Sequence, residues 1–146
     1  MAGSREFETP LDKTRESAAA FLIEMCTGLV VEQMPRLHAY DFKIRKRDGT
    51  PYALGEFKWR GEEYASLPTY KVDKSKIDNL RAYADKHGVK AIFFAQWGDG
   101  SVHFIDCHRH FDKFRVSTMK RKRNAEWRVE KTDVVYEWPI NLFKMC

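Results

Sequence analysis

The chain has 146 residues, which is the size of one ordinary domain, so one core must support the whole function. Hydrophobic residues make up 43% of it and charged residues 32%, a composition that excludes a disordered chain and a membrane-spanning one. The first residues lack the basic and then apolar order of a secretion signal. We therefore expect a single domain over residues 1–146 of a soluble, intracellular protein.

Positive charge is concentrated in one region of the chain. There are 26 Lys and Arg against 21 Asp and Glu, which gives a net charge of +5. Residues 109–131 alone contain nine basic and three acidic side chains, so the remainder is nearly neutral. This basic C-terminal extension predicts a surface that binds a polyanion, and the alternative is a basic surface that contacts only solvent.

The chain contains three cysteines, Cys26, Cys107 and Cys146. They are odd in number and far apart in the chain, so we expect free thiols, as in a reducing compartment. Three histidines between residues 103 and 110 lie near Cys107, but no second cluster has the paired spacing of a zinc site. We expect these histidines at the surface or at strand ends.

Hydrophobic periodicity predicts a helix over residues 12–28, followed by a short strand over 29–32. Residues 40–46 alternate polar and apolar side chains, as a half-buried strand does. Asp48-Gly49 is a strong two-residue turn signal, so residues 53–59 are expected to return as the second strand of a hairpin.

The second half of the chain continues the alternation of strands and helices. Residues 91–95 are apolar enough for a central strand that is buried on both faces. The predicted elements are a helix from residue 73 or 74 to 87, a hairpin of strands 89–97 and 101–107, an exposed connection at 119–124, and strands at 126–131 and 132–138. The fold class is therefore α/β, with a central mixed sheet flanked by helices.

The first hairpin brings three charged residues together. A two-residue turn at Asp48-Gly49 pairs Asp41 with Glu56 across the strands, and paired residues share a face of the sheet. Lys58 lies two positions beyond Glu56 and points to the same face, about 6 to 7 Å further along the strand. Phe57 lies on the opposite face, toward the core.

Two carboxylates in such a pair repel each other unless a cation lies between them. Carboxylate oxygens are ligands that Mg²⁺ prefers, and Mg²⁺ commonly takes only one or two of them while it keeps positions for water and phosphate. The alternative is a solvated, salt-bridged face of the sheet, which pairing and composition alone do not exclude. A longer turn would also change the register and weaken the prediction.

The motif Tyr40-Asp41 … Gly55-Glu56-Phe57-Lys58, with a glutamate-bearing helix before it and a helix and apolar strand after it, resembles the PD-(D/E)XK nuclease superfamily. The similar order of elements covers about residues 16–107, and Tyr40 replaces the Pro of the superfamily name. The resemblance implies a restriction-endonuclease-like αβββαβ core, as in Holliday-junction resolvases. It also implies hydrolysis of phosphodiester bonds in nucleic acid.

In such a site Asp41, Glu56 and the backbone carbonyl of Phe57 would hold Mg²⁺ or Mn²⁺, and Lys58 would position the attacking water. A helix glutamate would complete the site. Glu16 is the first candidate because it shares a stripe with small residues that allow close approach to the sheet, and Glu24 is the rival.

Further residues are candidates for contact with nucleic acid. Residues 69–76 resemble a segment of small phage and bacterial members of the superfamily, and Lys76 within it could contact a phosphate. A solvated position in the first turns of a helix is the alternative for Lys76. The basic run Lys120, Arg121, Lys122 and Arg123 could contact phosphates or form an exposed loop. Tyr70 and Trp59 are more typical of core or rim positions than of base stacking.

The sequence therefore predicts a Mg²⁺-dependent endonuclease that acts on DNA, with branched or structured DNA as an option that the resemblance suggests. The resemblance also allows a homodimer, and it implies the cytoplasm of a bacterial or phage-infected cell. The alternative is a nucleic-acid-binding module on the same fold that does not cleave. Retention of Asp41, Glu56 and Lys58 together disfavours that alternative.

Overall fold

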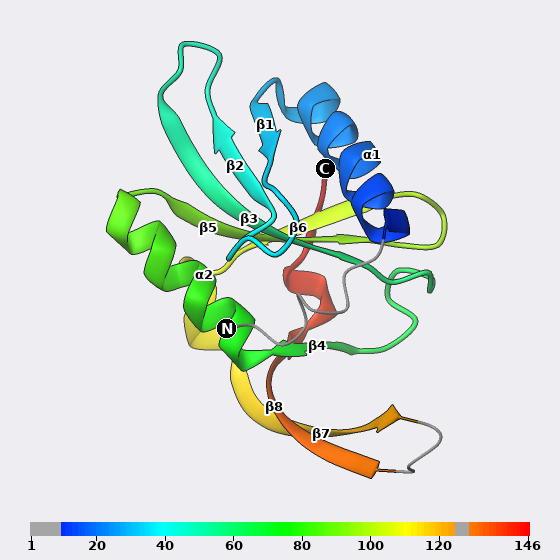
Figure 1. Ribbon diagram of the computed structural model, residues 1–146. Coiled ribbons are helices and arrows are strands. Elements are labelled where there is room, and N and C mark those ends of the chain that lie inside the picture. The colour runs from blue at the N-terminus through cyan, green and yellow to red at the C-terminus, as the bar shows by residue number, and fades with distance from the viewer. Residues whose placement is uncertain (1–9, 125–128) are drawn as a thin grey trace.

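The computed structural model describes residues 10–124 and 129–146 (Figure 1). A six-stranded central sheet has the order β1-β2-β3-β5-β6-β9, in which β3 and β5 are parallel and the other neighbours are antiparallel. Its strands are β1 (Val30–Gln33), β2 (Phe42–Arg45), β3 (Pro51–Trp59), β5 (Lys90–Gln96), β6 (Val102–Asp106) and β9 (Lys144–Met145). The predicted α/β class with a central mixed sheet is confirmed.

Two helices pack on opposite faces of this sheet. Successive side chains of a strand alternate between its faces, so the sheet presents apolar side chains on both sides and each helix covers one of them. Helix α1 (Pro10–Thr27) packs through Ala19 and Ile23 against one face, where Phe57 also lies. Helix α2 (Lys74–His87) packs on the other face, where Leu54 lies. Strand β5 supplies buried residues to both cores, so the prediction of a central strand buried on both faces is confirmed.

Both predicted helices are present, with small differences at their ends. Helix α1 begins at Pro10, which a first turn tolerates because its N–H would have no partner inside the helix. Helix α2 ends at His87 and is capped by Gly88, whose φ of 65° places it in the left-handed region that glycine adopts without strain. In the part of the chain that the structure describes, neither helix is long and apolar enough to cross a membrane.

The β2–β3 hairpin reaches the predicted register by a different route. Lys46 N–H donates to the Thr50 carbonyl, so the turn contains three residues and not two. A bulge opposite Ile44 and Arg45 then restores the pairing, and Phe42 faces Gly55 as a two-residue turn would have placed it. The longer turn and the bulge compensate each other, which is why the predicted alignment of β2 with β3 is correct.

A second, three-stranded sheet has the order β4-β8-β7, and the sequence predicted it only in part. Its strands are β4 (Thr69–Asp73), β7 (Arg115–Asn124) and β8 (Val129–Pro139), and short 3₁₀ turns lie at Phe111–Lys113 and Ile140–Leu142. The predicted connection at 119–124 is wrong, because these residues belong to β7. The two strands predicted at 126–131 and 132–138 correspond to the single strand β8 over the residues that the structure describes. Residues 125–128 lie outside the described part of the chain.

The error at β7 has a physical cause. Four consecutive basic residues give no alternation of polar and apolar side chains, which is the signal that predicts a strand. An edge strand needs only its backbone ladder with one neighbour, and charged side chains suit such an edge. The β7–β8 hairpin extends away from the central sheet in Figure 1.

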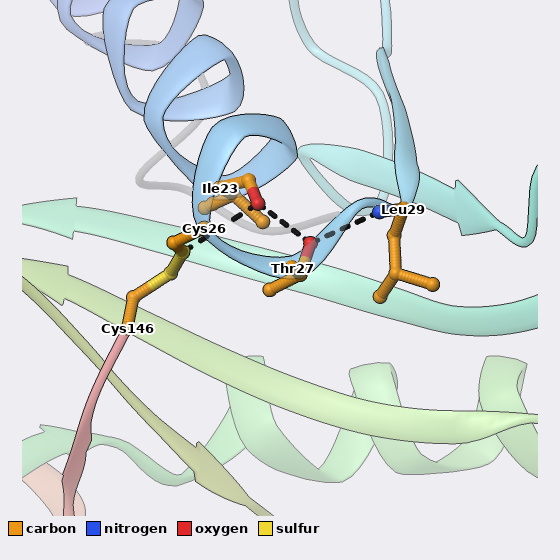
Figure 2. Close-up of a disulfide and its surroundings, with 5 residues drawn as sticks. All are labelled: Ile23, Cys26, Thr27, Leu29 and Cys146. Atoms are coloured by element: carbon orange, nitrogen blue, oxygen red, sulfur yellow. Dashed lines mark hydrogen bonds between the residues drawn. A yellow bond between two sulfur atoms is a disulfide. The ribbon is translucent and has the colours of Figure 1, made fainter.

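The prediction of three free thiols is wrong for two of them, since Cys26 and Cys146 form a disulfide (Figure 2). Cys26 lies at the end of α1 and Cys146 follows β9, and their Cα atoms are 6.0 Å apart although 120 positions separate them in sequence. Distance along the chain therefore did not predict distance in space. Cys107 is free, as predicted, and it is buried in the core.

We expect that reduction of this disulfide, or a Cys146→Ser substitution, lowers the free energy of unfolding by about 2 to 5 kcal/mol, because the bond closes a long loop in the unfolded chain. Urea unfolding with and without reductant measures the change. The matched control is the double variant Cys26→Ser, Cys146→Ser, whose stability reductant should no longer affect. Cys107→Ser does not serve as a control, because the Cys107 thiol is buried in the core. An equal effect of reductant on the double variant would contradict the assignment.

Candidate active site

Asp41 lies directly before β2, where β2 and β3 begin to separate. Its backbone N–H donates to the Gly55 carbonyl at 3.0 Å, and its Oδ2 accepts the Phe57 N–H at 2.8 Å. The Asp41 carboxylate thus accepts the Phe57 N–H in place of a backbone carbonyl of the neighbouring strand. Asp41 therefore bonds to the backbone of the two residues that flank Glu56 on β3, while the strand pairing itself ends at Phe42 and Gly55.

Glycine at position 55 has a steric reason. A Cβ atom there would lie 3.0 Å from the Phe94 ring and 3.2 Å from Phe42, so any other residue would push these core side chains aside. Gly55 therefore allows two aromatic rings to pack over β3 immediately beside Glu56. This packing holds the strand that presents the candidate catalytic residues.

Glu56 and Lys58 point from β3 to the α2 face of the sheet. Glu56 is only 2% exposed, whereas Lys58 is exposed. Both residues line a pocket of about 180 Å³ whose remaining lining comes from neighbouring strands, α2 and the β7–β8 hairpin. The lining residues are Glu56, Phe57, Lys58, Arg60, Val72, Asp73, Lys76, Phe93 and Met119.

The backbone of Phe57 supplies another oxygen at this point. In a strand the N–H and C=O of one residue point toward the same neighbouring strand. Because the Phe57 N–H points at Asp41, its carbonyl is directed into the same widening gap between β2 and β3. The carbonyl that the family resemblance implicates is thus on the Asp41 side of β3.

Glu16 lies on the buried stripe of α1 with Ala19 and Ala20, and it is 4% exposed. Its Oε2 lies 3.3 Å from the Nζ atom of Lys13, which also donates to the Met34 carbonyl at 3.1 Å. The Met34 N–H in turn donates to the Asp41 carbonyl. A short chain of contacts therefore connects Glu16 to the segment that carries Asp41.

Glu24, the rival helix glutamate, has a different position. Its Oε2 accepts the Val31 N–H at 2.9 Å, near the C-terminal end of α1. This bond fixes the connection between α1 and β1. Glu24 is thus bonded to the backbone of β1, whereas the contacts of Glu16 lead through Lys13 and Met34 toward Asp41.

The oxygen atoms at this place suit a hard divalent cation. Asp41, Glu56 and Glu16 are carboxylates at most 4% exposed, and the Lys13 and Lys76 ammonium groups lie near Glu16 and Glu56. Within residues 10–124 and 129–146, no three His, Cys, Asp or Glu side chains converge as a preformed metal cage. Mg²⁺ needs no such cage, since one or two carboxylates with a carbonyl and water suffice. The donor set therefore fits Mg²⁺ or Mn²⁺ at Asp41, Glu56 and Phe57.

Lys76 enters the pocket from the first turn of α2. Its Nζ atom lies 3.8 Å from Glu56 Oε2, and its side chain is 14% exposed. The sequence identified Lys76 as a candidate but did not predict that it pairs with Glu56. That pairing depends on how α2 packs on β3, which no local pattern specifies.

Arg60 is a pocket residue that the sequence patterns did not identify. Its Nε donates to the Tyr70 hydroxyl at 2.6 Å and a terminal nitrogen donates to the Lys71 carbonyl at 3.0 Å. Burial raises the pKa of Tyr70 to about 12, so this hydroxyl stays protonated. The available signal was the alternation Glu56, Lys58, Arg60, which places all three on one face.

The two aromatic candidates, Tyr70 and Trp59, have structural positions. Tyr70 is buried among aromatic rings, with its ring 5.5 Å from that of Trp138. Trp59 is partly buried on the α1 side, where the Arg15 guanidinium lies 4.5 Å from its ring centre.

The basic run lies on β7, which is the edge strand of the second sheet. Lys120 is exposed, and Met119 beside it lines the pocket that contains Glu56. Arg121, Lys122 and Arg123 follow in the same strand, which pairs through its backbone with β8. The structure thus places the start of the basic run next to the pocket.

The Cys and His residues near position 107 do not meet. Cys107 is buried, and burial raises the pKa of its thiol. His108 Nε2 lies 2.8 Å from Asp85 Oδ1, and the His103 ring stacks on Tyr64 at 3.9 Å between centres. Burial lowers the pKa of His103. These side chains have separate structural contacts.

Comparison with known proteins gives two matches. A family model described as "Phage putative PDDEXK endonuclease" matches residues 3–145. Among solved structures, the Holliday junction resolvase Hjc of the archaeal hyperthermophile Archaeoglobus fulgidus is similar, with a TM-score of 0.56 and 12% identity over 88% of this chain and 84% of that chain. No curated protein matches. At this identity the Hjc likeness establishes similarity of fold.

Proposed function

Because the chain belongs to the family described as "Phage putative PDDEXK endonuclease", we propose that it is a divalent-metal-dependent endonuclease that hydrolyses phosphodiester bonds in DNA. The observation that carries this proposal is the position of Asp41 and Glu56. Both carboxylates are nearly buried, Asp41 is bonded to the backbone of the two residues that flank Glu56, and Lys58 follows Glu56 on the pocket side. That combination suits cleavage of a phosphodiester better than it suits a purely structural salt bridge.

Asp41, Glu56 and the Phe57 carbonyl would hold Mg²⁺ or Mn²⁺, and Glu16 would complete the site directly or through water. When bound, the ion acidifies water and offsets the charge that grows on the phosphate. Lys58 orients the attacking water and stabilises the negative charge of the transition state. Burial of Asp41 and Glu56 lowers the local dielectric constant, which strengthens these electrostatic interactions.

The nucleic-acid surface would continue from the pocket along β7. Lys76 lies in the pocket, and Lys120, Arg121, Lys122 and Arg123 follow Met119 on the edge strand. A two-stranded ribbon can enter the major groove of B-DNA, and basic side chains on it can contact phosphates. This arrangement supports binding of duplex DNA on the hairpin side of the pocket.

Replacing Lys120, Arg121, Lys122 and Arg123 together by glutamine is expected to weaken DNA binding while leaving the cleavage step of bound substrate largely intact. The slope of log K against log salt should fall by roughly 0.9 for each phosphate that the variant no longer neutralises. Fluorescence anisotropy at several salt concentrations measures the slope, and single-turnover cleavage at saturating protein measures the chemical step. An unchanged slope would mean that the basic run only protects the edge strand.

The proposed substrate includes branched or otherwise structured DNA. The solved structure similar in fold is named a Holliday junction resolvase, which supports four-way junctions as the substrate to test first. A symmetric junction would also suit a homodimer, in which each copy cuts one strand.

The deciding experiment incubates linear duplex, single-stranded and four-way-junction DNA, and a single-stranded RNA, with the protein and Mg²⁺, Mn²⁺ or EDTA. Metal-dependent cleavage that is lost in Asp41→Asn supports the nuclease. Metal-independent binding without cleavage of any substrate would instead support the non-catalytic binding module.

A further inference from the structure

Lysines occupy an unusual place at the start of α2. The first turn of a helix favours acidic side chains because the positive end of the helix dipole lies there. The first turn of α2 has no acidic residue and carries Lys74 and Lys76. Each lysine therefore needs local compensation, and the two obtain it in different ways.

Lys74 is compensated within its own helix. Its Nζ atom lies 2.6 Å from Asp78 Oδ2, and its side chain is 38% exposed. The side-chain hydrogen bond with Asp78 raises the pKa of Lys74. This pair lies one turn along α2, and Lys74 is not among the residues that line the pocket.

Lys76 is compensated by Glu56, a residue of another element that belongs to the candidate metal site. The pair is 3.8 Å apart, and the two side chains are 14% and 3% exposed. The contact is long for a hydrogen-bonded pair, and it lies inside a pocket with room for water and ions. Lys76 thus supplies positive charge beside the carboxylate that a divalent cation would contact.

On the basis of the proposed function, we propose that Lys76 is a positioning residue that occupies Glu56 in the metal-free protein and transfers to a DNA phosphate when the divalent cation binds. A lysine fits this role because its stem is flexible and its ammonium is a compact charge that can change partners. The cation and the ammonium compete for one carboxylate, so metal binding releases Lys76. The released ammonium then favours a phosphate in the same pocket.

This arrangement couples the metal and the DNA. Without metal, Glu56 holds Lys76 and the pocket presents less free positive charge to a phosphate. With metal, the pocket gains the charge of the ion and the freed lysine together. Because linkage is reciprocal, DNA that takes up Lys76 must also favour binding of the metal at Glu56.

The test uses the full chain and measures binding, separately from cleavage. Mn²⁺ alone is titrated in the absence of DNA, with free Mn²⁺ followed by electron paramagnetic resonance. Lys76→Met removes the competing charge and should bind Mn²⁺ at least about threefold more tightly than the unsubstituted protein. Lys74→Met is the matched control, because it removes a lysine of the same helix turn outside the pocket, and its Mn²⁺ affinity should not change.

The second measurement is duplex DNA affinity in EDTA and in Ca²⁺, with the DNA verified to be intact. Lys76→Met should weaken DNA binding in both, and the loss should be larger in Ca²⁺, about fivefold or more, because only then is Lys76 released. Lys76→Arg should retain part of the DNA affinity. If Lys76 had only a structural role, its substitution would weaken the binding of both Mn²⁺ and DNA, or of neither. Tighter Mn²⁺ binding together with weaker DNA binding therefore identifies the exchange.

The outcomes separate this inference from the proposed function. Unchanged or weaker Mn²⁺ binding by a folded Lys76→Met variant, with normal Mn²⁺ binding by the unsubstituted protein, would overturn the exchange alone. The unsubstituted protein should bind Mn²⁺ at a site that the Glu56→Gln substitution abolishes. Absence of such a site would overturn the proposal of a metal-dependent nuclease itself. Circular dichroism of each variant checks that α2 is retained.

Discussion

Glu56→Gln is expected to reduce phosphodiester cleavage by at least about 10³-fold, because it removes the charge that holds the divalent cation but keeps the shape of the side chain. Glu56 is 2% exposed and its neighbours pack around it, so an isosteric amide leaves the fold in place. Single-turnover cleavage of a labelled DNA with Mg²⁺ measures the loss. Mn²⁺ affinity should fall in the same variant.

The matched control is Glu32→Gln. Glu32 is exposed on β1, where it pairs with Arg45 at 3.3 Å, and it does not belong to the pocket lining. This variant should cleave at the normal rate. Full activity of Glu56→Gln would show that the paired carboxylates are a structural feature of the sheet and do not hold the catalytic ion.

Lys58→Met is expected to lower the cleavage rate by roughly 10²- to 10³-fold while Mn²⁺ affinity changes little. Lys58 lies on the pocket side of β3 and is exposed, so its replacement removes a charge from the reacting region without disturbing the core. Rate constants at saturating metal and protein separate this effect from weaker binding.

Lys43→Met is the control for the loss of a lysine near this site. Lys43 is exposed on β2 and pairs with Leu54 in the ladder, but it does not line the pocket. Its cleavage rate should stay within about twofold of the unsubstituted protein, since surface substitutions of this kind usually have small effects. A rate for Lys58→Met as high as that of Lys43→Met would exclude Lys58 from the chemistry.

Local patterns predicted the β2–β3 hairpin well because its information is contained in adjacent residues. Alternation assigned Glu56 and Lys58 to one face and Phe57 to the other, and the predicted register agrees with the pairing of Phe42 with Gly55. The predicted turn was one residue too short, and the bulge in β3 compensated for that. A bulge depends on the packing of the whole strand, so this part of the agreement was fortunate.

Strand β7 and the disulfide were not predicted, because both depend on long-range contacts. Backbone hydrogen bonds with β8 hold the β7 segment as a strand, although it is highly charged and its polar and apolar side chains do not alternate. Packing of β9 beside β6 brings Cys146 to the end of α1, where Cys26 lies. Neither contact leaves a signal in nearby residues.

The sequence by itself determined the two helices, the hairpin with its Asp and Glu-x-Lys residues, and the α/β class, because hydrophobic period and turn residues act over a few positions. Only the tertiary structure decided that Lys76 meets Glu56, that Arg60 enters the pocket, and that a basic hairpin begins beside it. These residues come from elements far apart in the chain, and their approach depends on how α2 and the second sheet pack on β3.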